Sequence, residues 1–131
     1  MNSSLRSDER VQYASVRRME SKSRPGASYS IRRISFGRRL ELARKIRELD
    51  RRLEFLKAGD DAVSKVEAAI VSREVDRVYL SWGLASVEGV LIDGEPATPE
   101  TLVESGPEDL TQEILEAIKA ECFLSEEERK N

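Results

Sequence analysis

Few side chains in this sequence could perform catalysis or hold a metal ion. Its 131 residues contain no histidine and one cysteine, which excludes catalytic triads with histidine, cysteine–histidine pairs, histidine-containing zinc sites and an intramolecular disulfide. The nearest approaches to a metal-binding pattern are the run Glu126–Glu128 and the pair Glu113 and Glu116. Adjacent residues on a helix point apart, and the pair has no second such motif, so both are interpreted as solvated polar faces.

Neither a reactive thiol nor a phosphate-binding loop is indicated. Cys122 lies on the apolar side of its predicted helix, with no basic residue immediately beside it, and is interpreted as a small buried hydrophobic residue. Gly83, Gly89 and Gly94 match neither the dinucleotide-binding nor the P-loop pattern. We therefore expect a protein that is not an enzyme and that uses no cofactor.

The charge is divided unevenly along the chain. Residues 1–57 hold 16 basic and 7 acidic side chains, a net charge of +9, whereas residues 58–131 hold 6 and 18, a net charge of −12. One interpretation is that the two halves pack on each other, or pair between copies of the chain in a homo-oligomer. The other is that the basic half contacts an anion and the acidic half a cationic partner.

Two long helices are the strongest structural signal. An apolar stripe with spacings of three and four residues predicts a helix over residues 36–58, and a second stripe predicts a helix over residues 61–82. The short linker between them favours an antiparallel hairpin. The second stripe rotates by one residue between Ile70 and Val71, which predicts that this helix contacts two neighbours.

The remaining chain predicts a flexible tail, a small β ribbon and shorter helices. Residues 1–27 are serine-rich and basic, and are expected to be a flexible tail before a single helical domain at 28–124. A strand over 29–34 is expected to pair with the segment around 89–93, which ends in the turn Asp93–Gly94. Helix starts are predicted at Thr98–Pro99, at Gly106–Pro107 and at the capping box Ser125–Glu128, so that residues 125–131 would begin a further helix.

These elements predict a mainly α fold: a helical hairpin, shorter C-terminal helices and a two-stranded β ribbon. The predicted core contains Leu42, Ile46, Leu49, Leu53, Val66, Ile70, Val78, Trp82, Ile114 and Ile118. No apolar run approaches the roughly 20 residues that cross a membrane, and the first residues carry no apolar stretch of a secretory signal. We therefore expect no membrane partner and a cytoplasmic location.

The candidate binding residues are basic side chains of the first long helix and the single tryptophan. They are proposed as protein-binding residues, and they are Arg38, Arg39, Arg44, Arg47, Arg51 and Trp82. Acidic side chains lie among these basic ones and no groove-binding motif accompanies them, so nucleic acid is not the favoured ligand. The alternatives are a nucleic-acid-binding or regulatory module that uses residues 17–52, and a small adaptor subunit of a larger assembly.

Several short motifs resemble the tail assembly chaperones of long-tailed phages and prophages. They are the strand Tyr29–Arg32, the segment Ile34–Arg39 that opens a charged helix, Trp82–Leu84, Val87–Gly89, Ile92–Pro96 and the acidic helical ending. The resemblance covers residues 28–131 and excludes the preceding segment.

The resemblance implies a non-catalytic protein of the bacterial host cytoplasm. Such chaperones coat a long helical tape-measure protein before the tail tube polymerises around it, so the implied partner is a tape-measure or tail tube protein. Many are made in two lengths by ribosomal frameshifting, and a longer product is accordingly expected here. The family has no fixed catalytic motif, so the resemblance assigns no site residue.

Overall fold

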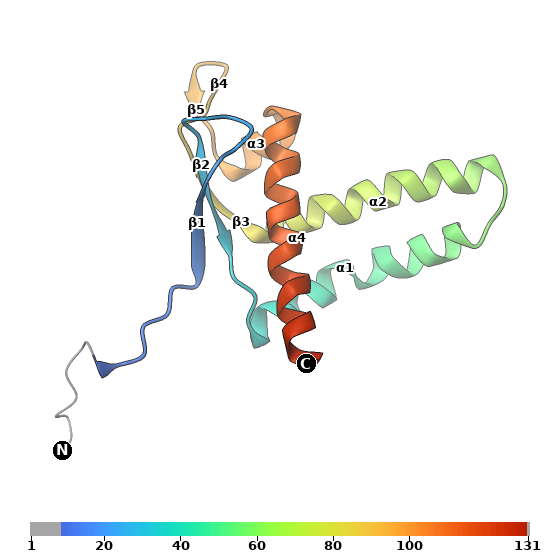
Figure 1. The fold of residues 1–131 in the computed structure, drawn as a ribbon. Coiled ribbons are helices and arrows are strands. Elements are labelled where there is room, and N and C mark those ends of the chain that lie inside the picture. The colour runs from blue at the N-terminus through green and yellow to red at the C-terminus, as the bar shows by residue number, and fades with distance from the viewer. Residues whose placement is uncertain (1–8, 131) are drawn as a thin grey trace.

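The computed structural model describes residues 9–130, which form a mainly helical protein with a small antiparallel sheet (Figure 1). The predicted fold class is confirmed. The helices are α1 (Phe36–Lys57), α2 (Ala62–Gly83), α3 (Pro99–Ser105) and α4 (Glu108–Lys130). The strands are β1 (Val16–Glu20), β2 (Ser28–Arg32), β3 (Leu84–Glu88), β4 (Leu91–Ile92) and β5 (Glu95–Pro96).

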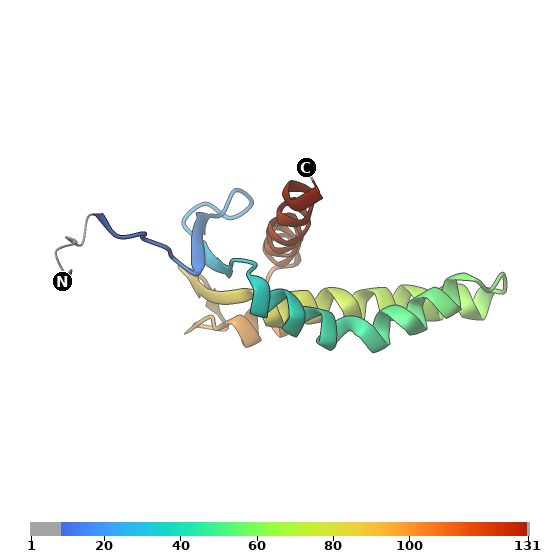
Figure 2. The same cartoon turned by 90° about the horizontal axis from the view of Figure 1, so that it is seen from below.

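Helices α1 and α2 form the predicted antiparallel hairpin, and most of its length projects away from the rest of the chain (Figures 1 and 2). We call the projecting part, residues 43–72, the arm, and the remaining described residues the body. Each helix begins at a capping residue: the Ser35 side chain accepts a hydrogen bond from the Arg38 backbone N–H, and Asp61 accepts one from the Ser64 backbone N–H. The capping residues therefore fix where α1 begins and where the chain turns into α2.

The sheet differs from the predicted ribbon in its partners. β2 lies between β1 and β3, and both pairs are antiparallel. The predicted strand around residue 29 therefore pairs with residues 84–88 rather than 89–93. The segment Leu91–Ile92 pairs instead with β5, across a two-residue turn at Asp93 and Gly94, which both have positive φ. Such a turn matches the twist of a hairpin, so the local pairing forms in place of the long-range one.

The segment predicted to be a flexible tail contributes a strand. Residues 16–20 form β1 along the free edge of β2, and Met19 packs against the core. The apolar pattern of this segment is weak because an edge strand buries little and gains mainly backbone hydrogen bonds. Residues 1–8 of the predicted tail lie outside the described residues.

The core lies between the sheet, α4 and the end of α2 that joins the body. Ile31 of β2 and Ile114 and Ile118 of α4 are 0% exposed. Gly83 allows α4 to approach, because a Cβ atom at this position would lie 2.7 Å from Cγ2 of Ile118. Cys122 is buried in this core, as predicted.

Part of the predicted core is confirmed and part is wrong. Leu42, Trp82, Ile114 and Ile118 are buried, and Ile46, Leu49, Leu53 and Val78 are partly buried. The prediction is wrong for Val66 and Ile70, which are exposed. The face of α2 that meets α1 is set by Val71, Val75 and Val78, and the rotated stripe of Val66 and Ile70 points elsewhere.

The predicted C-terminal helix start is also wrong. α4 runs without interruption from Glu108 to Lys130, so residues 125–130 continue a long helix rather than begin a new one. A serine followed three residues later by glutamate forms a capping box only when the serine backbone is non-helical. Inside a helix the glutamates are simply good helix formers. Asn131 lies outside the described residues.

Candidate protein-binding surface

One face of α1 carries basic residues between exposed apolar ones. Arg44, Arg47 and Arg51 are exposed and are separated by three or four positions, so they lie on one side of the helix. The same spacing continues to Phe36 at one end and to Phe55 at the other, which are 87% and 79% exposed. We call this side the outer face of α1, because it lies opposite the leucine stripe that packs on α2.

The predicted binding residues therefore divide into two groups. Arg44, Arg47 and Arg51 lie together on the outer face. Arg38 and Arg39 are partly buried at the start of α1, and Trp82 is buried at the end of α2. The structure does not bring all six residues together. At 3.6 residues per turn, Arg38 and Arg39 lie to either side of the leucine stripe rather than on the outer face.

A second exposed surface lies on α2. Val63, Val66 and Ile70 are 71%, 60% and 50% exposed, and the three- and four-residue spacing places them in one stripe. The sequence predicts that this helix contacts two neighbours, and α2 packs on α1 along its length and on α3 and α4 near the body. The stripe leads into a groove of about 670 Å³ where the arm meets α3 and α4, lined by Val66, Ile70, Leu80, Val103 and Leu115 among others. The helical spacing predicts the stripe, but the prediction that Val66 and Ile70 belong to the core is wrong.

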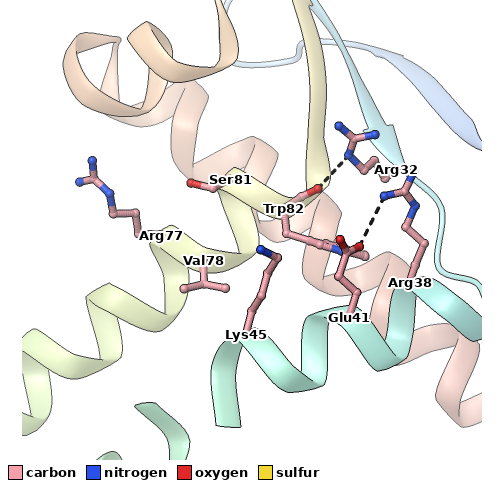
Figure 3. Close-up of a pocket in the computed structure, with 8 residues that line it drawn as sticks. All are labelled: Arg32, Arg38, Glu41, Lys45, Arg77, Val78, Ser81 and Trp82. Atoms are coloured by element: carbon pink, nitrogen blue, oxygen red, sulfur yellow. Dashed lines mark hydrogen bonds and ion pairs between the residues drawn. The ribbon is translucent and has the colours of Figure 1, made fainter. Parts of the chain in front are cut away.

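A pocket at the base of the arm contains two of the predicted residues, Arg38 and Trp82 (Figure 3). Its volume is about 580 Å³. The indole N–H of Trp82 donates to Oε1 of Glu41 over 3.1 Å, and the same oxygen lies 3.6 Å from a guanidinium nitrogen of Arg38. Nε of Arg32 donates to the Trp82 backbone carbonyl over 2.9 Å. These contacts join β2, α1 and α2, and we call the hollow the basal pocket.

The basal pocket could be found only in part from the sequence. Besides Arg38, Glu41 and Trp82, it is lined by Arg32, Lys45, Arg77, Val78 and Ser81. Arg32 and Arg77 were not selected as site residues, because they stand far apart in sequence and bear no local pattern. They come together only because β2 runs beside the junction of α2 and β3.

A carboxylate on α4 fixes the loop between β1 and β2. Glu113 accepts hydrogen bonds from the backbone N–H groups of Lys22 and Ser23, from the hydroxyls of Ser21 and Ser23, and from the Tyr29 hydroxyl, over 2.7–3.1 Å. Burial by itself raises the pKa of Glu113, but these donors outweigh burial and lower the pKa to about 2. Burial and the bond to Glu113 raise the pKa of Tyr29 to about 12.

This cluster is a structural anchor rather than a reactive site. The carboxylate is saturated with donors from its own chain, so it is not poised to exchange a proton near neutral pH. The sequence predicts that Glu113 belongs to a polar helical face and that residues 21–23 belong to a flexible tail. Only the serine content of that segment hinted at local hydrogen bonding.

Neither a metal-binding group nor a membrane-crossing helix is found in the part of the chain that the structure describes. Within it, no three histidine, cysteine, aspartate or glutamate residues are grouped so as to hold a metal ion. No described helix combines the length and apolar character needed to cross a bilayer. Comparison of the chain with protein-family models, with curated proteins and with solved structures finds no match.

Proposed function

We propose that this chain is a non-catalytic, tail assembly chaperone-like protein that binds a long helical tape-measure protein and keeps it soluble. The observation that carries the proposal is the exposed stripe of Val63, Val66 and Ile70 on the arm. An apolar stripe of this kind costs free energy in water, and it gains stability when a partner covers it. The motifs that resemble tail assembly chaperones give the class of partner.

The shape of the arm supports a helical partner. α1 and α2 each contain 22 residues, which corresponds to a length of about 33 Å. A partner helix laid along α2 would bury apolar side chains at the helical spacing that the stripe itself has. The outer face of α1 offers basic residues between Phe36 and Phe55, which suits an acidic amphipathic segment.

Co-expression tests this proposal. The proposal implies a neighbouring reading frame that encodes a long helical protein, and that protein is produced alone, with the wild-type chain, or with a Val66→Glu, Ile70→Glu double variant. The wild type should keep the long protein soluble and the double variant should not, because two carboxylates would have to be buried in the interface.

The matched control is Leu91→Glu. Leu91 is also an exposed apolar residue, but it lies on β4 of the body, away from the arm (Figure 1). This variant should retain the solubilising activity. Equal activity of the double variant and the wild type would contradict the assignment of the stripe, and failure of the wild type would contradict the chaperone function.

A nucleic-acid-binding module is the second candidate, because Arg44, Arg47 and Arg51 line one exposed face. Four acidic residues on the same helix weaken its positive field, so we expect no more than non-specific affinity for duplex DNA, with a dissociation constant of roughly 100 µM at about 150 mM salt. A tight complex that weakens steeply with salt would favour this candidate over the chaperone.

A further inference from the structure

The basal pocket has more positive than negative charge. Four cationic side chains line it, and Glu41 is the single carboxylate among its lining residues. They come from three elements: Arg32 from β2, Arg38 and Lys45 from α1, and Arg77 from α2. In the view of Figure 3, Lys45 lies between Arg77 on one side and the pair of Arg32 and Arg38 on the other.

The carboxylates within reach of these cations are already engaged. Oε1 of Glu41 accepts from Trp82 and is shared with Arg38. Arg77 forms an ion pair with Glu104 of α3, which is not a lining residue of the pocket. Lys45 makes no ion pair with any side chain of the described residues. The Lys45 ammonium therefore has hydrogen-bond donors to offer to a ligand.

The walls of the pocket combine this charge with apolar surface. Val78, Trp82 and the hydroxyl-bearing Ser81 line the pocket beside the cationic groups (Figure 3). A volume of about 580 Å³ lies in the range of pockets that hold small molecules or single side chains. Charge-assisted hydrogen bonds from ammonium and guanidinium groups are strongest to carboxylate and phosphate oxygens.

We propose that the basal pocket is a binding site for an oxyanion, a phosphate or carboxylate group, held chiefly by Lys45 with help from Arg32 and Arg77. Such a ligand offsets the excess of positive over negative charge among the side chains that line the pocket. The site is separate from the apolar stripe of the arm, and it can be tested on the isolated protein.

Trp82 reports on occupancy of this pocket. It is the single tryptophan of the chain, it lines the pocket and its N–H is bonded to Glu41. An anion bound beside Lys45 changes the electric field at the indole, so the emission of Trp82 should change with a saturable dependence on ligand concentration. The probes are sodium phosphate and a hexaglutamate peptide, each compared with sodium chloride at equal ionic strength.

Two variants distinguish binding in the pocket from a general effect of the protein's net charge. Lys45→Gln should weaken binding of the effective probe about tenfold. Arg44→Gln removes the same charge one residue away, on the outer face of α1, and should change binding less than twofold. Both positions are exposed, so both variants should fold, which circular dichroism would verify.

The two probes also distinguish the sources of the anion. Saturation by phosphate alone supports the site and identifies phosphate as its ligand, whereas saturation by hexaglutamate alone identifies a carboxylate of a protein segment. Saturation by both supports a general oxyanion site. The proposal is overturned if neither probe differs from sodium chloride, or if Lys45→Gln binds as well as the wild type.

Discussion

Apolar side chains with the same helical spacing are buried to different degrees in the body and in the arm. In the body, Ile114 and Ile118 of α4 are completely buried between the sheet and α2. In the arm, Leu49 and Leu53 are only partly covered, and Val63, Val66 and Ile70 are exposed. The difference arises because α4 has neighbours on several sides, whereas each arm helix has the other as its neighbour. Helical periodicity thus specifies a face, and the number of neighbours decides whether that face is core.

This comparison predicts its largest effect for truncations of apolar residues. Ile118→Ala should lower the free energy of unfolding by about 3–4 kcal/mol, because it leaves a cavity among rigid neighbours. Leu49→Ala should lower it by about 1 kcal/mol, because the side chain is already partly in solvent. Urea unfolding followed by circular dichroism measures both. Equal losses for the two variants would contradict the distinction between body and arm.

The anchor at Glu113 predicts the next effect. Glu113→Gln should lower the free energy of unfolding by about 2 kcal/mol at pH 7, because an amide replaces a carboxylate that accepts several donors. The pKa of Glu113 is lowered to about 2 from an ordinary value of 4.5. The stabilisation is therefore fully present above pH 4.5 and is lost as the pH falls toward 2.

Unfolding measured across this pH range tests the anchor. The difference in stability between the wild type and Glu113→Gln should shrink as the pH falls from 4.5 toward 2, because the Glu113 carboxyl is protonated first in the unfolded state and then, near pH 2, in the folded state. A difference that stays constant from pH 7 to pH 2 would show that the carboxylate charge is not what anchors the loop.

Hydrogen exchange should show that the arm opens locally at a lower free-energy cost than the body. Backbone amides of residues 46–56 and 63–70 should exchange about tenfold faster, or more, than those of residues 110–122, because local opening of the arm exposes little apolar surface. Mass spectrometry of peptides from each region gives the comparison. Uniform protection along α1, α2 and α4 would indicate that the arm opens only when the whole protein unfolds.

The smallest effect on stability is expected at the exposed stripe. Val66→Glu and Ile70→Glu should each change the free energy of unfolding by no more than about 0.5 kcal/mol, because both side chains are solvent-exposed. Thermal unfolding of the single variants checks this. A loss comparable with that of Ile118→Ala would mean that the stripe belongs to the core.

The sequence predicts the helices well because their signals are local. The caps Ser35, Asp61 and Thr98 all lie where their side-chain chemistry predicts. Strand pairing is long-range, so the predicted partner of residues 29–34 is wrong. β1 is not predicted because an edge strand carries little apolar pattern. The box at Ser125 was misread because the same letters suit a helix interior.

The candidate site was predictable to a lesser degree. The periodicity of α1 already implies that Arg44, Arg47 and Arg51 share a face. The association of Arg32 and Arg77 with Lys45 depends on the packing of β2 beside α2, which no local pattern encodes. The exposure of Val66 and Ile70 is not predictable either, although these residues do form a local pattern. An apolar stripe that no neighbour covers has the same sequence spacing as one that is buried.

Site-specific photo-crosslinking tests the central claim, that the exposed stripe of the arm binds a helical protein, most directly. A photoreactive amino acid is placed at residue 70 on the arm or at residue 95 on the β4–β5 hairpin, in cells that co-express the long helical partner that the proposal implies. Irradiation should give a covalent adduct with that protein from residue 70 and not from residue 95. Adducts from residue 95 alone, or from neither position, would contradict the account.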